Sequence, residues 1–231
     1  DGVITSDEWG PDSFFDVVII DSCLYGLNIT WDADFLWIGL NSDTCRYFLG
    51  DDPDNISLFV AIDTDQTFGS GAPTDGYGNV NFYGCRMPEY IFYFAGGAGW
   101  YEWNYWTGTE FEWRGWRNDN TFYAWDGGGV YDDELGILWS DLGFPTGVGV
   151  MAWITFDQTF NGDPPGVLAS WPIENPIGIL PIFTWAYPFF FPHVPGPMPV
   201  AGFLPNALCG DNGEFSATQP STWGAVKALY K

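Results

Sequence analysis

The sequence predicts an all-β protein, an antiparallel β-sandwich followed by a proline-rich, aromatic and uncharged C-terminal extension. Short runs of β-branched and aromatic residues alternate with clusters of Gly, Asp, Asn and Pro, with turn signals about every 8–12 residues, as in sandwiches and barrels. No long segment keeps the 3.6-residue apolar period of an amphipathic helix. Between Glu174 and Asp211, 36 residues include eight prolines and seven aromatic residues but no Asp, Glu, Lys or Arg.

The predicted strands follow one another through most of the chain. In order they are Phe15–Ile20, Leu24–Trp31, Leu36–Asn41, Leu58–Ile62, Tyr90–Phe94, Trp100–Trp106, Glu110–Arg114, Thr121–Trp125, Glu134–Trp139 and Gly147–Phe156. The WDAD sequence at 31–34 indicates a tight turn between two of them. Only Trp223–Tyr230 suits a short helix or a terminal strand.

We expect three parts in the chain. Residues 1–157 form the sandwich, residues 158–222 form the extension, and residues 223–231 form a short basic tail that contains both lysines. Proline interrupts the extension too often for a membrane-spanning helix, and the extension is too apolar for a solvated linker. Either the body of the chain or a neighbouring molecule must therefore cover it.

The charge is strongly acidic, with 30 acidic residues against six Lys and Arg and a formal net charge of −24. Nucleic acid and anionic membrane surfaces need basic patches, so this balance argues against both. It favours neutral partners, such as polysaccharide or another protein surface, and cations, Ca²⁺ above all.

The four cysteines lack the spacing of a zinc or haem site. They are Cys23, Cys45, Cys85 and Cys209. An even count in an acidic, lysine-poor chain favours two disulfides and an exported protein, with free thiols as the alternative. Of the three pairings we prefer Cys23–Cys45 with Cys85–Cys209. A first residue other than Met is consistent with a removed signal peptide, and we expect an extracellular or cell-surface location.

Four segments within residues 1–157 resemble the DOMON-like superfamily, and more closely the family 9 carbohydrate-binding modules and related secreted bacterial β-sandwich domains. These segments are DGVITSDEWG at 1–10, LYGLNITWDADFLWIGLNSDT at 24–44, LFVAIDTDQTFGSG at 58–71 and ELGILWSDLGFPTGVGVMAWIT at 134–155. The resemblance implies a β-sandwich, and it says nothing about residues 158–222.

The loop after the predicted strand Leu58–Ile62 is a candidate Ca²⁺ site. Asp63, Asp65 and Asp75 offer carboxylates there, and Ca²⁺ takes six to eight hard oxygen ligands. The resemblance also implies a structural Ca²⁺ near this strand. The alternative is that these residues are turn formers, because Asp bonds to its own backbone.

An aromatic and acidic strip follows, and it is a candidate sugar platform on which pyranose faces would stack. Its members are Trp100, Glu102, Trp103, Trp106, Glu112, Trp113 and Trp116. On a strand Trp103 faces away from Glu102 and Trp106, so an apolar core face with an amphipathic outer face is the alternative. No catalytic triad or phosphate loop is present, and we expect no enzyme activity.

The leading functional interpretation is a secreted structural subunit that assembles with copies of itself through its C-terminal extension. The expected contact residues are Phe183, Trp185, Tyr187, Phe189, Phe190, Phe191, Phe203, Trp223 and Lys227. A carbohydrate-binding module is the alternative. An extension that folds back onto the sandwich favours the module, and one that leaves the body favours assembly, because large exposed apolar patches are rare on soluble monomers.

Overall fold

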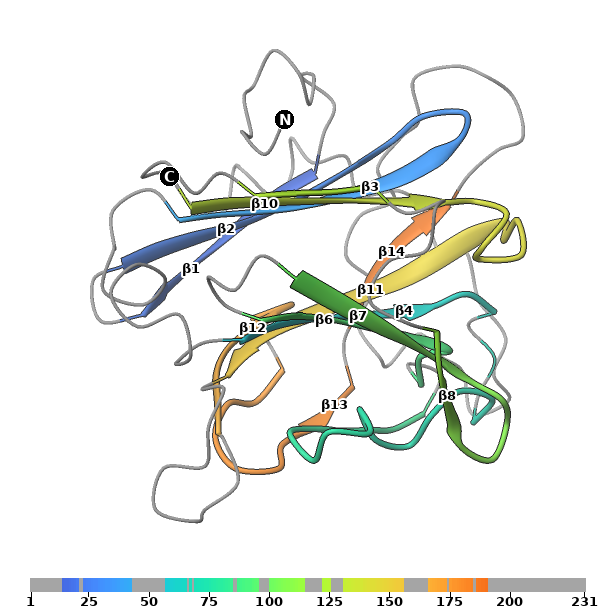
Figure 1. Cartoon of the computed structure of the whole chain (residues 1–231). Coiled ribbons are helices and arrows are strands. Elements are labelled where there is room, and N and C mark those ends of the chain that lie inside the picture. The colour runs from blue at the N-terminus through green and yellow to red at the C-terminus, as the bar shows by residue number, and fades with distance from the viewer. Residues whose placement is uncertain are drawn as a thin grey trace, which may run out of the picture.

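Two antiparallel β-sheets pack face to face in the computed structural model of the chain (Figure 1). The structure describes residues 14–20, 23–42, 57–65, 67, 69–84, 87–95, 100–114, 122–125, 131–155, 166–173, 175–184 and 186–190. The predicted all-β sandwich is confirmed.

The first sheet has five strands. Its order is β1 (Phe14–Ile20), β2 (Cys23–Trp31), β3 (Phe35–Ser42), β10 (Tyr131–Leu138) and β9 (Phe122–Trp125). The turn between β2 and β3 is the predicted one, because Asp32 Oδ1 accepts the backbone N–H groups of Asp34 at 2.8 Å and Phe35 at 2.7 Å. This turn fixes the register that pairs Ile29 with Ile38.

The second sheet has seven strands. Its order is β12 (Val167–Trp171), β11 (Gly147–Thr155), β4 (Ser57–Asp63), β6 (Tyr90–Ala95), β7 (Trp100–Trp106) and β8 (Phe111–Trp113), and β14 (Tyr187–Phe190) also pairs with β11. A separate two-stranded parallel pair joins β5 (Asn81–Phe82) to β13 (Ile182–Phe183). All ten predicted strands are present, with ends shifted by at most three residues, the usual scatter of strand ends. The sequence did not predict β5, β12, β13 and β14.

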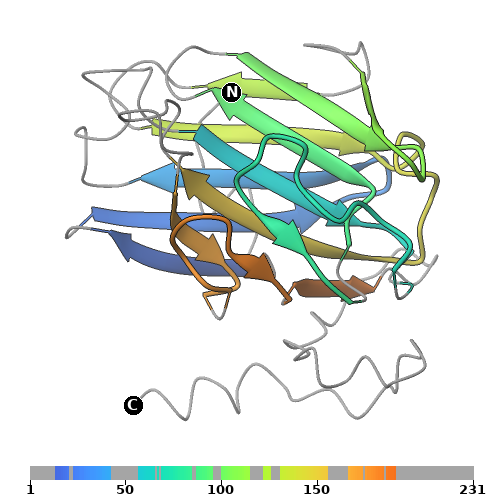
Figure 2. The same cartoon turned by 90° about the horizontal axis from the view of Figure 1, so that it is seen from below.

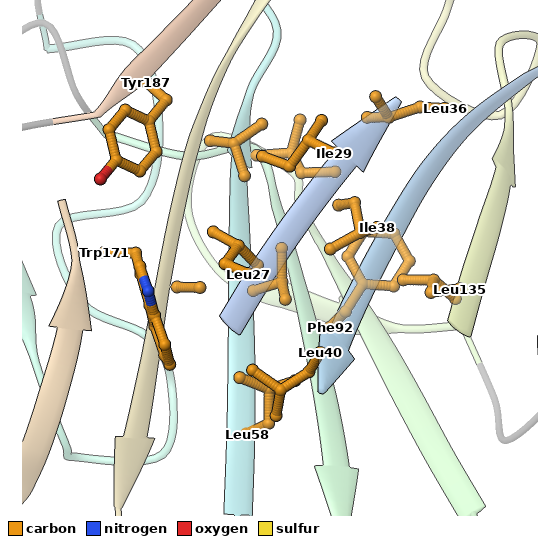
Figure 3. Close-up of a cluster of buried hydrophobic side chains, with 14 of the residues drawn as sticks. Leu27, Ile29, Leu36, Ile38, Leu40, Leu58, Phe92, Leu135, Trp171 and Tyr187 are labelled. Carbon is orange, nitrogen blue, oxygen red and sulfur yellow. The ribbon is translucent and has the colours of Figure 1, made fainter. Parts of the chain in front are cut away.

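The main core lies between the two sheets (Figure 3). Leu27, Ile38 and Leu40 from the first sheet meet Leu58 and Phe92 from the second. Each of these side chains is buried, and full burial of such a side chain contributes about 1.5–3 kcal/mol. Apolar and polar residues alternate along β2 and β3, so the apolar side chains of both strands point to the same face of the sheet, which packs on the second sheet.

A second core covers the outer face of the seven-stranded sheet. Every residue of β4 and β11 is buried, as expected for strands that are covered on both faces. On the outer face Phe59 stacks on Trp153 with ring centroids 5.2 Å apart, and Phe183 meets Trp153 edge-on at 5.4 Å. The cover consists of the segments around β5 and β13, which lie across this sheet when the molecule is seen from below (Figure 2).

The C-terminal part of the described chain belongs to the sandwich. Strand β12 pairs with Ala152–Thr155 of β11, and β14 pairs with Gly147–Val150 along the same strand. The structure therefore differs from the expected division at residue 157, because three strands of the expected extension complete the sheet or cover its outer face. The expected tail at 223–231 lies outside the described residues.

Candidate functional site

A hydrogen-bonded network occupies the outer face of β7 and β8, where the sequence predicted a sugar platform. The Tyr77 hydroxyl donates to Glu102 Oε1 at 2.5 Å, and the Trp113 indole N–H donates to Glu102 Oε2 at 3.1 Å. Asn104 Nδ2 donates to the Tyr77 hydroxyl oxygen at 2.6 Å. Burial, together with the contact to Glu102, raises the pKa of Tyr77 far above its ordinary value. Both carboxylate oxygens of Glu102 are thus engaged within the protein.

The aromatic members of the predicted platform are separated by the sheet. Trp103 lies in the core between the sheets and is only 7% exposed, which agrees with the alternative interpretation of that strand face. Trp106 is partly buried and meets Phe111 edge-on at 5.3 Å, whereas Trp113 is 53% exposed. Glu112 forms an ion pair with Arg114 at 2.9 Å.

The side chains of two predicted platform residues are not described. Trp100 begins β7, but only its backbone is described, and Trp116 lies outside the described residues. Of the seven predicted platform residues, the structure therefore brings Glu102 and Trp113 into direct contact. It does not form a row of rings from the others that it describes.

An acidic cluster lies at the end of β4, as the sequence predicted, but with a different third member. Carboxylate oxygens of Asp63, Asp65 and Glu89 all lie within 4.8 Å of one another. Glu89 directly precedes β6, and its backbone N–H donates to the Ile62 carbonyl oxygen at 3.0 Å, so the antiparallel pairing of β4 and β6 places it beside Asp63. Three carboxylates fit the hard oxygen set of Ca²⁺ and supply part of the six to eight ligands it takes.

The electrostatics of this cluster centre on Glu89. Its Oε2 atom accepts the Thr64 backbone N–H at 2.7 Å and the Thr64 hydroxyl at 3.1 Å, and its Oε1 atom is buried without a hydrogen-bond partner in the described part of the chain. Burial first, and then the charge of Asp65, raise the pKa of Glu89 to about 7. A cation placed among the three carboxylates would reverse this effect.

Asp75 does not join the cluster. Its carboxylate accepts the backbone N–H groups of Tyr77 at 3.1 Å, Gly78 at 2.9 Å and Asn79 at 3.2 Å. Desolvation raises the pKa of Asp75 despite these bonds. For Asp75 the structure therefore matches the alternative that we gave, a turn-forming Asp, and Glu89 takes the place of the third carboxylate.

Exposed aliphatic side chains gather on the segment that follows β12 and ends in β13. We name the following residues the aliphatic patch: Ile173, Ile177, Ile179, Leu180 and Ile182, which are between 46% and 66% exposed. The segment lies at the bottom of Figure 1, against the outer face of the seven-stranded sheet. Tyr83 adds a further exposed ring nearby, since its backbone N–H donates to the Phe183 carbonyl oxygen at 3.2 Å.

The residues expected to make assembly contacts divide into three groups. Phe183 is fully buried in the outer core and Tyr187 is buried in the main core, so neither offers its ring to a neighbour. Phe189 and Phe190 lie in β14, where only the backbone is described. The others lie outside the described residues: Trp185, Phe191, Phe203, Trp223 and Lys227.

The predicted disulfides stay a prediction. Cys23 begins β2, but its side chain is not described, and Cys45, Cys85 and Cys209 lie outside the described residues. In the part of the chain that the structure describes, no helix is long and apolar enough to cross a membrane.

Comparison of the sequence with family models and with curated proteins identifies no relative of the chain. The likeness to DOMON-like and family 9 carbohydrate-binding domains therefore remains an expectation from the sequence.

Proposed function

We propose that this chain is a secreted structural subunit that assembles with copies of itself through the aliphatic patch. One observation carries the proposal: five aliphatic side chains within ten residues, Ile173 to Ile182, are exposed together. They present on the order of 500 Å² of apolar surface, comparable to the largest apolar patch of a typical monomer, and such patches are often functional. The role is structural rather than catalytic.

Backbone pairing and one buried ring hold the patch against the body. Strand β13 pairs with β5, and Gly178 exchanges backbone hydrogen bonds with Val167 at 2.7 and 2.8 Å. Beneath the patch, Phe183 anchors the segment in the outer core. An apolar surface that meets a different surface on the next copy gives contacts that propagate without closing, as a filament, tube or layer requires.

A pair of serine variants tests this proposal. Replacing Ile177 and Ile179 by Ser removes much of the exposed aliphatic surface without touching the core, because both side chains are more than 60% exposed. The matched control is Ile19→Ser, since Ile19 is 72% exposed on edge strand β1 of the other sheet. Electron microscopy and sedimentation of the natively purified chain should show regular assemblies for the wild type and the control, and monomers for the patch variant.

A wild-type chain that stays a 25.8 kDa monomer at all concentrations would refute the assembly proposal. Assemblies that persist in the patch variant would locate the contact elsewhere and would overturn the role of the patch.

Carbohydrate binding is the second candidate, and the exposed ring of Trp113 favours it. Trp113 is the exposed tryptophan of β8, and its indole N–H already orients the Glu102 carboxylate. A sugar could stack on its face, as sugars do on exposed tryptophans. Glycan-array binding that is lost in Trp113→Ala would support this function, and an array without any binding would remove its support.

Ca²⁺ at Asp63, Asp65 and Glu89 belongs to the same proposal as a structural ion. Two of these carboxylates come from the end of β4 and one from the start of β6, so the ion would tie two central strands together. No catalytic step is assigned to it.

A further inference from the structure

A pocket opens between the two sheets, on the inner side of β6 and β7. Its volume is about 440 Å³, within the range of pockets that hold small ligands or single side chains. It is lined by Tyr90 of β6, Trp103 and Tyr105 of β7, Arg114 after β8, and Ser140 and Asp141 of the loop that follows β10. Of the side chains described above, Trp103 and Arg114 also line this pocket.

The walls form an aromatic cage. The Tyr90 ring stacks on Trp103 with centroids 6.0 Å apart and meets Tyr105 at 5.1 Å. The Arg114 guanidinium already lies over the Tyr105 ring, 5.4 Å from its centroid, so this cage holds one cation–π contact of its own. Cages of this type recognise ammonium groups through the negative faces of the rings.

Trp103 contributes its ring to the pocket wall and no hydrogen bond to a ligand. It is more than nine-tenths buried, and its indole N–H, which has no hydrogen-bond partner among the described residues, is itself closed to solvent and so to a ligand in the pocket.

The local charge favours a cation. Asp141 lines the pocket, and Glu112 offsets the charge of Arg114 at 2.9 Å. Arg114 is the one Lys or Arg among the residues that the structure describes, in a chain with a net charge of −24. Both lysines of the chain lie in its last five residues, Lys227 and Lys231, and Trp223 and Tyr230 flank them with aromatic rings.

From the pocket and this charge distribution, we propose that the cage of Tyr90, Trp103 and Tyr105 with Asp141 binds the lysine-bearing segment 223–231 of a second copy of the chain. The pocket accepts the ammonium group of a lysine of that segment. This inference deepens the proposed self-assembly by adding a second joint, in which the tail of one copy enters the body of the next.

The test measures tail binding separately from assembly. The host is the full-length chain with Ile177→Ser and Ile179→Ser to keep it monomeric, and with Lys227→Gln and Lys231→Gln so that its own tail does not compete. The probe is a fluorescein-labelled peptide of residues 220–231, followed by fluorescence anisotropy. We expect saturable binding that weakens with added salt and disappears when both peptide lysines are replaced by Gln.

Pocket variants of the same host locate the site. Asp141→Asn and Tyr105→Leu should each raise the Kd about fivefold or more, the effect of losing one close charge or cation–π contact. Trp113→Leu, on the opposite face of the sheet, should leave the Kd unchanged. Thermal unfolding of each variant separates a lost contact from a lost fold, and Asp141→Asn is the conservative change if Tyr105→Leu unfolds.

A peptide that does not bind, or that binds equally to the Asp141→Asn and Tyr105→Leu hosts, would overturn the inference. Because the host carries the patch substitutions, tail binding is read out whether or not the aliphatic patch drives assembly. The two proposals can therefore fail independently.

Discussion

The Tyr187 hydroxyl donates a hydrogen bond to Asp16 Oδ2, which joins β14 to β1 across 171 residues of sequence. The Tyr187 ring also packs on Phe14, with ring centroids 4.4 Å apart. The last described strand is thus tied to the first, and each belongs to a different sheet. The uncharged C-terminal segment folds back onto the body at least as far as residue 190, which by the criterion set from the sequence favours a self-contained module. The assembly proposal therefore rests on the aliphatic patch, which stays exposed on the segment that folds back.

The Tyr187–Asp16 contact is expected to stabilise the closed sandwich. Tyr187→Phe removes the donor, keeps the ring, and leaves the partly buried Asp16 without this hydrogen bond. A hydrogen bond to a charged group contributes about 1.5–3 kcal/mol, so the free energy of unfolding should fall by about that amount in urea titrations. Tyr83→Phe is the control. The Tyr83 side chain is 63% exposed, so removing its hydroxyl should lower the free energy of unfolding by less than about 0.5 kcal/mol. Equal stability of the Tyr187→Phe variant and the wild type would contradict the role given to this contact.

The two residues of β13 face opposite environments: one is buried in the outer core and the other is exposed. Phe183 is fully buried against Trp153, whereas Ile182 is 54% exposed in the aliphatic patch. Phe183→Ala should lower the free energy of unfolding by about 3–5 kcal/mol through loss of packing and a cavity.

The matched change, Ile182→Ala, should alter the unfolding free energy by less than about 0.5 kcal/mol but weaken self-association. The check is chemical unfolding of both variants beside sedimentation of both. A Phe183→Ala variant that is as stable as Ile182→Ala would show that β13 does not hold the outer core together.

The sequence predicts most of the sandwich because local signals match the fold there. Ten strands alternate or run apolar over enough residues to be recognised, and Asp32 marks its turn through a local hydrogen bond. Strands β5 and β13 have two residues each and exist only because they pair with each other across about 100 residues of sequence. Strand β14 contains Pro188, and proline argues against a strand until the pairing on β11 is known.

The candidate sites were predictable only where neighbours in space are neighbours in sequence. Asp63 and Asp65 follow one strand and were named together, whereas Glu89, which lies beside them, comes from the next strand of the sheet and was not named. Its position directly before the predicted strand Tyr90–Phe94 was the available signal. The exposure of Ile177 and Ile179 could not be predicted from the sequence, because an apolar run does not reveal which of its residues face the core.

The raised pKa of Glu89 predicts a pH dependence of stability. Its pKa is about 7 in the folded protein and near 4.5 when unfolded, so between these values the folded state binds more protons. Stability from this group is therefore present at low pH and is lost as the pH rises from about 4.5 to about 7, by about 3 kcal/mol.

The measurement is the unfolding free energy in EDTA at pH 5 and pH 8, for the wild type and for Glu89→Gln. The many other carboxylates also repel one another more strongly as the pH rises, so the informative quantity is the difference between the two proteins. We expect a steeper decline for the wild type, and parallel pH profiles would show that Glu89 titrates normally.

Addition of Ca²⁺ at pH 8 is expected to restore the free energy of unfolding that is lost when Glu89 ionises. A cation among Asp63, Asp65 and Glu89 favours the ionised carboxylates, and binding to the folded state alone stabilises it by about 2.7 kcal/mol at a concentration 100 times the Kd. Thermal unfolding should shift upward with Ca²⁺ in the wild type and much less in Glu89→Gln and Asp65→Asn. Asp34→Asn is the matched control, because Asp34 is an exposed acid in the β2–β3 turn, and it should keep the full shift. The same upward shift in all four proteins would mean that Ca²⁺ acts on the general negative charge, since only a bound ion at the end of β4 requires these particular carboxylates.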